Sequence, residues 1–90
     1  MVGKLKTETL DETVTVAGEL MEEILAEALK KKASTVKEIS LEVGDLSACK
    51  PEELTNSLQL LAEGTIAQEA KITVKTVEGV DCIVKKIVIR

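Results

Sequence analysis

The sequence predicts one α+β domain of two layers, in which two helices cover one face of a three-stranded mixed sheet. The chain has 90 residues, the size of a single domain. Two segments repeat apolar residues at helical spacing, and three shorter segments alternate apolar and polar residues as strands do. The predicted order is helix, strand, helix, strand, strand. Residues 1–11 carry no clear period, so we assign them to an N-terminal arm or tail and the domain itself to residues 12–90.

The first helix is predicted over residues 12–32. Asp11 or Thr13 is expected to cap it, because a side-chain oxygen there accepts a hydrogen bond from a free first-turn amide. Three lysines at residues 30–32 close the helix, where positive charge complements the helix dipole. An apolar stripe predicts the buried face of this helix. The stripe consists of Ala17, Leu20, Met21, Ile24, Leu25, Ala28 and Leu29.

The middle of the chain predicts a strand followed by a second helix. Apolar and polar residues alternate through residues 38–43, and Gly44 with Asp45 ends the strand. Pro51 opens the helix, because proline lacks the N–H that would be unpaired at that position. Gly64 is placed to form the C-terminal cap. The apolar positions of the strand and the helix are Ile39, Leu41, Val43, Leu54, Leu58 and Leu61.

Two further strands are predicted at residues 72–76 and 82–89, joined by a turn at Glu78-Gly79. The first and second strands can lie parallel through a right-handed crossover. The last strand is apolar on both faces, so we expect it between the other two and antiparallel to the second. Strict alternation would put Val84 and Val88 on the uncovered sheet face as an apolar strip for a partner or a second copy. In this prediction, one face of the strand carries Ile83, Ile87 and Ile89, and the other carries Cys82, Val84 and Val88.

The composition argues against an enzyme, a nucleic-acid-binding protein and a membrane protein. The chain has no His, Phe, Trp or Tyr, and its net charge is −4. It therefore lacks the commonest acid–base side chain, and it lacks the cationic surface and stacking rings of nucleic-acid sites. No apolar run approaches the roughly 20 residues of a membrane span. A non-catalytic, cytoplasmic binding or assembly module is predicted.

The two cysteines, Cys49 and Cys82, do not make a structural zinc site, which usually takes four Cys or His ligands. We expect both to be small buried hydrophobes in a reducing cytosol. A reactive thiol at Cys49, beside Lys50 and just before a helix, leaves a weak Cys/carboxylate metal or redox protein as an alternative. No catalytic, cofactor-binding or metal-ligating residue is assigned.

Several segments resemble the HypA/HybF family of hydrogenase nickel-insertion proteins. Residues 36–47 read Val-Lys-Glu-Ile-Ser-Leu-Glu-Val-Gly-Asp-Leu-Ser, and residues 60–67 read Leu-Leu-Ala-Glu-Gly-Thr-Ile-Ala. Pro-Glu-Glu-Leu at residues 51–54 and Ala-Lys-Ile-Thr-Val at residues 70–74 continue the likeness. In order and spacing, it runs from about residue 12 to residue 77.

The resemblance implies a nickel-binding α/β domain and a zinc domain with two Cys-x-x-Cys pairs inserted between the last two strands. The family holds nickel through a Met-His-Glu start and works with a GTPase called HypB in maturing hydrogenase or urease. This sequence has no Met-His-Glu near residues 11–13, and residues 77–81 join the last two strands directly. The nickel and zinc ligands of the family are therefore not carried over.

The sequence favours a non-catalytic HypA-like accessory protein that contacts a HypB-like GTPase or a hydrogenase precursor. An interaction or self-assembly module on the same scaffold, forming a homo-oligomer, is the alternative. The metal or redox protein is the second alternative.

Overall fold

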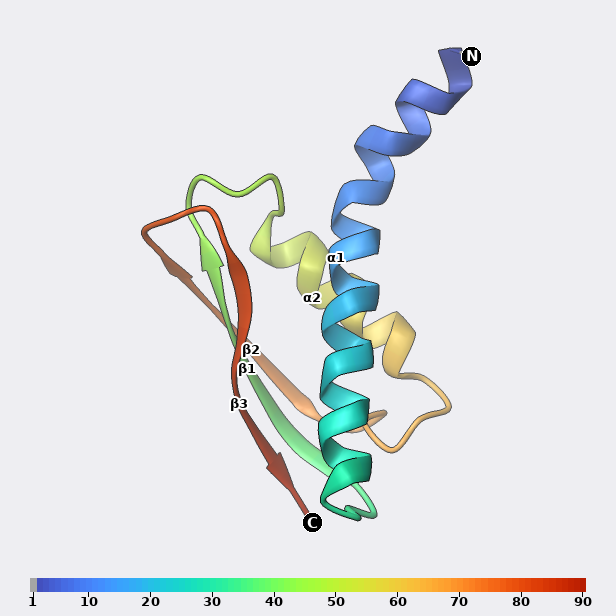
Figure 1. Cartoon of the computed structure of the whole chain (residues 1–90), viewed down its shortest axis with the longest axis vertical. Helices are drawn as coiled ribbons and strands as arrows, with labels where there is room; N and C mark the ends of the chain where they lie inside the picture. The colour runs from blue at the N-terminus through green and yellow to red at the C-terminus, as the bar shows by residue number, and fades with distance from the viewer. Residues whose placement is uncertain (1) are drawn as a thin grey trace.

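The computed structural model describes the backbone of residues 2–90 and the side chains of residues 13–90. Both helices lie on the same side of the sheet (Figure 1). This arrangement confirms the predicted α+β class, the element order and the placement of the helices on one face. The elements are α1 (Val2–Lys30), β1 (Val36–Gly44), α2 (Pro51–Ala62), β2 (Lys71–Val77) and β3 (Cys82–Ile89).

The helix α1 is longer than the sequence predicts. It begins at Val2, so the prediction of a capped start at Asp11 or Thr13 is wrong. Thr13 instead lies inside the helix and is buried, while the side chain of Asp11 lies outside the described residues. The helical backbone thus reaches into residues 1–11, and the division between an arm and a domain stays a prediction. Lys30 ends the helix, at the basic end that the sequence predicts.

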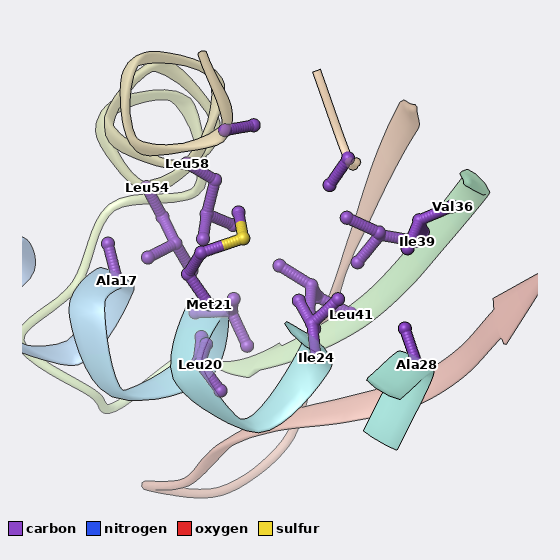
Figure 2. Close-up of a cluster of buried hydrophobic side chains, with 13 residues drawn as sticks. Ala17, Leu20, Met21, Ile24, Ala28, Val36, Ile39, Leu41, Leu54 and Leu58 are labelled. Atoms are coloured by element: carbon purple, nitrogen blue, oxygen red, sulfur yellow. The ribbon is translucent and has the colours of Figure 1, made fainter. Parts of the chain in front are cut away.

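The core lies between the helices and the sheet (Figure 2). Most of the predicted α1 stripe is buried, and Leu25 packs partly against it, but Leu29 is 77% exposed. Leu29 lies about 100° around the helix from the buried Ala28, which turns its side chain away from the sheet. In α2 the buried row runs through every fourth residue and includes Ala62, whereas Leu61 is 40% exposed. The buried apolar cluster consists of Ala17, Leu20, Met21, Ile24, Ala28, Val36, Ile39, Leu41, Val43, Leu54, Leu58, Ala62 and Ala67.

The strand order is β2-β1-β3, so β1 is the central strand. β1 is parallel to β2, as the sequence predicts, and antiparallel to β3. The predictions that the last strand lies in the centre and pairs with the second strand are therefore wrong. β1 carries the most completely buried inner face, with Ile39, Leu41 and Val43 all in the core, and this burial under both helices favours the central place.

A β-bulge at Lys85 explains why the predicted faces of the last strand are wrong. Ser40 pairs with Lys86 and Leu41 pairs with Val84, so Lys85 is an extra residue in β3. An extra residue reverses the alternation of side chains beyond it. Val84 consequently packs against the core and does not join Val88 in a strip on the uncovered face. The residues of β3 that pack against the core are Cys82, Val84, Ile87 and Ile89.

Two glycines adopt the backbone conformations that their turns need. Gly64 follows the end of α2 with a φ of 79°, which confirms its predicted place at the C-terminal cap. Gly79 has a φ of 130° and turns the chain between β2 and β3, at the predicted Glu78-Gly79 turn. Within the described chain, neither helix combines the length and hydropathy that a bilayer crossing requires.

Candidate interaction surfaces

The cysteines occupy packed positions in the fold. Cys49 precedes α2 and is buried, while Cys82 begins β3 beside Val43 of β1 and is half-buried. The Ser47 Oγ hydroxyl donates a hydrogen bond to the carbonyl oxygen of Cys49 at 3.3 Å. Across residues 13–90, no three His, Cys, Asp or Glu side chains gather closely enough to hold a metal ion. The weak Cys/carboxylate metal or redox alternative stays a prediction.

The turn between β2 and β3 is tied to the end of β1. The Oδ1 atom of Asp45 accepts a hydrogen bond from the backbone N–H of Gly79 at 3.2 Å. Backbone amides of residues 44–46 also donate to the second strand and its turn. The pairs are Gly44 N to Asp81 O (2.7 Å), Asp45 N to Val77 O (2.7 Å) and Leu46 N to Gly79 O (2.9 Å). The Gly-Asp-Leu motif that carries much of the family resemblance thus works as a structural clasp.

A small apolar patch lies beside this clasp. Leu46 and Val80, on the two segments that the clasp joins, are largely exposed. A hollow of about 190 Å³ lies next to Val80 and is lined by acidic side chains that include Glu42, Glu78 and Asp81. Val80 therefore gives this acidic hollow an exposed apolar border.

The sheet face opposite the helices carries alternating charges. Strand register sets three rows of neighbours across β2, β1 and β3 on this face. The rows are Lys71, Glu38 and Val88; Thr73, Ser40 and Lys86; and Lys75, Glu42 and Ile83. Two of the three lysines therefore have a glutamate directly beside them. The apolar residues on this face are Ile83 and Val88, in place of the predicted Val84 and Val88.

Sequence reasoning missed a groove between α1 and the edge of β3. Its lining is contributed by Glu23, Ile24, Glu27, Val84, Lys85, Lys86 and Ile87. The groove depends on which strand lies at the sheet edge, and the sequence analysis placed β3 in the centre. The adjacent Lys85 and Lys86 were the available signal, because lysines inside a strand are typical of an exposed edge.

Comparisons with known proteins identify the family. A model of the HypA family, described as a hydrogenase/urease nickel incorporation metallochaperone, matches residues 12–83. The hydrogenase maturation factor HypA of Methanosarcina acetivorans is 35% identical over 63 residues, covering 70% of this chain and 47% of that protein. HypA of Methanocaldococcus jannaschii is 42% identical over 48 residues, covering 53% of this chain and 39% of that protein. The chain thus spans about half the length of the curated relatives it matches.

The fold has a counterpart among solved structures. The solution structure of the Ni metallochaperone HypA from Helicobacter pylori matches with a TM-score of 0.64 and covers 86% of this chain and 85% of that chain. At 12% sequence identity, this likeness shows a shared fold. The family model and the identities to the archaeal relatives show more, and they confirm the resemblance inferred from residues 36–74. The chain belongs to the HypA family.

Proposed function

We propose that this chain is a non-catalytic, cytoplasmic accessory protein of nickel-enzyme maturation, which works through protein–protein contacts and carries neither the nickel nor the zinc site of the family. One observation carries the proposal: the family model covers residues 12–83 in a chain with no histidine and two cysteines. The scaffold is retained while the commonest metal-ligating side chain is missing. Such a scaffold is suited to contacts with other maturation proteins.

The backbone of α1 supports the absence of the nickel site. The family resemblance implies nickel held by a histidine ring and by nitrogens at the chain start. In this chain the matching positions near residues 11–13 lie inside α1, which extends from Val2 to Lys30. An amide inside a helix donates its hydrogen to a carbonyl four residues earlier, so it offers no free amine to a metal.

The connection between β2 and β3 supports the absence of the zinc domain. The family resemblance implies an insertion with two Cys-x-x-Cys pairs between these strands. Here β2 ends at Val77 and β3 begins at Cys82, and the clasp holds the short connection against β1. Cys82 itself lies in β3 and packs against the core, which is not the place of a zinc ligand on an inserted domain.

Titration with Ni²⁺ tests the metal part of this proposal. We expect isothermal calorimetry to show no stoichiometric binding, because the chain lacks the histidine that the family uses. The Ni metallochaperone HypA of Helicobacter pylori serves as the positive control. The double variant Cys49→Ser/Cys82→Ser should give the same heats as the wild type. Stoichiometric binding that this variant abolishes would instead establish a cysteine metal site.

Co-purification from the native host tests the maturation part. We expect the tagged chain to recover a HypB-like GTPase or a hydrogenase precursor, identified by mass spectrometry. The untagged host serves as the control for proteins that bind the resin. Recovery of neither a maturation factor nor a metalloenzyme subunit contradicts the proposed function. Self-assembly stays an alternative: the uncovered sheet face carries Ile83 and Val88, with Lys86 in the row between them.

A further inference from the structure

The groove between α1 and β3 combines an apolar floor with charged rims. Val84 and Ile87 are half-buried and give the floor its apolar surface, whereas Ile24 is almost completely buried at its base. Glu23 and Glu27 form the helix side, and Lys85 and Lys86 lie on the strand side. The groove holds about 250 Å³, below the roughly 300–1,000 Å³ of typical small-molecule sites. It has room for one or two side chains, which favours a polypeptide over a small ligand.

The strand side of the groove is an open sheet edge. β3 pairs with β1 on one side, and no other strand of the described chain pairs with its second side. An edge strand presents backbone N–H and C=O groups that an extended segment of another chain can pair with. Backbone pairing along β3 would lay such a segment over the groove, with alternate side chains directed toward α1 and toward the outer face.

Charge decides what kind of segment fits. On the outer face, Lys71 and Lys75 each have a glutamate directly beside them in register, but the row of Lys86 contains Ser40 and Thr73. The next position of this row lies beyond the edge of the sheet, where an added strand would place a residue opposite Lys86. Opposite charges in such a cross-strand pair are favourable, so an acidic residue fits there.

A second copy of this chain fits the edge poorly. Antiparallel pairing of β3 with its own copy about the middle of the strand would bring Lys85 and Lys86 opposite the same two lysines. Like charges directly opposite each other are destabilising. The lysine pair thus disfavours pairing of β3 with its own copy.

We propose that the groove between α1 and β3 binds an extended acidic segment of a partner protein, which adds to β3 as a further strand. Apolar residues of this segment face Val84 and Ile87, and acidic residues alternate with them on the outer face beside Lys86. The groove side carries Glu23 and Glu27 from α1 but also Lys85 from β3, so the preference for acids rests on Lys86 on the outer face. This inference rests on the proposed function, because it names the surface by which the accessory protein contacts its partner.

An array of short peptides tests the charge rule. The peptides alternate Val with Glu, Lys or Ser, and the labelled full chain is the probe. We expect the Val/Glu peptides to bind best. Lys86→Glu should weaken their binding by about fivefold or more and should improve binding of the Val/Lys peptides. The matched control is Lys50→Glu, which makes the same charge change outside the groove and should leave the ranking unchanged.

Amide chemical shifts locate the binding, and thermal melts verify that both variants fold. With the best peptide, the largest shifts should fall on residues 82–89. Equal effects of Lys86→Glu and Lys50→Glu, or shifts that avoid β3, would overturn the inference.

If tagged Lys86→Glu still recovers the maturation partner in full, the groove is not the contact surface and the proposed function stands. If the wild type recovers no partner while Val/Glu peptides bind at β3, the proposed function fails and the groove remains a peptide site.

Discussion

Replacement of Ile24 by alanine is expected to lower the free energy of unfolding by about 2–5 kcal/mol. Ile24 is 1% exposed and lies in the middle of the α1 face that contacts the sheet (Figure 2). The substitution removes buried apolar atoms and leaves a cavity that the neighbouring side chains fill only in part. Since small domains are typically stable by about 5–15 kcal/mol, the loss is a large share of the total. Urea melts followed by far-UV circular dichroism measure it.

The control for Ile24 lies five residues further along the same helix. Leu29 belongs to the same predicted stripe but is 77% exposed. Leu29→Ala should therefore change the free energy of unfolding by no more than about 0.5 kcal/mol. Similar losses for Ile24→Ala and Leu29→Ala would mean that α1 does not bury the face described for it.

Replacement of Gly44 by alanine is expected to lower the free energy of unfolding by about 1–3 kcal/mol, as overpacking of a tight contact does. A Cβ atom on Gly44 would overlap the carbonyl oxygen of Gly79 and would lie 2.8 Å from the backbone nitrogen of Val80. Both obstacles are backbone atoms of the β2–β3 turn, so no side-chain rotation relieves them. The clasp hydrogen bonds would have to lengthen, so the amide of Leu46, which donates to Gly79, should exchange with solvent faster in the variant than in the wild type.

Replacement of Gly18 by alanine is expected to have the opposite effect on the free energy of unfolding. It lies inside α1, and a Cβ atom built there meets nothing within 4 Å. Gly18→Ala should therefore raise the free energy of unfolding by about 0.5–1 kcal/mol, because alanine loses less backbone entropy in a helix. If Gly44→Ala is as harmless as Gly18→Ala in urea melts, the turn does not close over the end of β1.

Local patterns predicted the interiors of the elements better than their ends and faces. Pro51 opens α2 and Gly64 follows its end as predicted, because both residues act on the backbone at their own positions. The predicted start of α1 was wrong because the prediction relied on an apolar period, and the residues before Thr13 have none although the helix begins at Val2. The exposed Leu29 and Leu61 show that a helical stripe fixes a face only to within about one residue.

The candidate site was the least predictable part. The sequence alone shows that the chain has no histidine and two cysteines, and the proposed function rests on this composition. The groove was not, because it needs β3 at the sheet edge and Val84 on its inner side. The edge place depends on the strand order of the whole sheet, and the side of Val84 depends on the bulge at Lys85, which is defined by pairing with Ser40 and Leu41 of a strand more than forty residues away.

The sequence by itself determined the family, the α+β class and the order of the elements, since apolar periods, turn residues and the 36–47 motif are local properties. Only the tertiary structure decided the strand order, the inner face of β3 and the role of Gly44. These depend on contacts between distant segments: β1 takes the centre because its inner face is buried under both helices, and its end admits the Gly79 turn because residue 44 has no Cβ. The register between strands is the physical quantity that local patterns leave open, and one extra residue is enough to reverse a face.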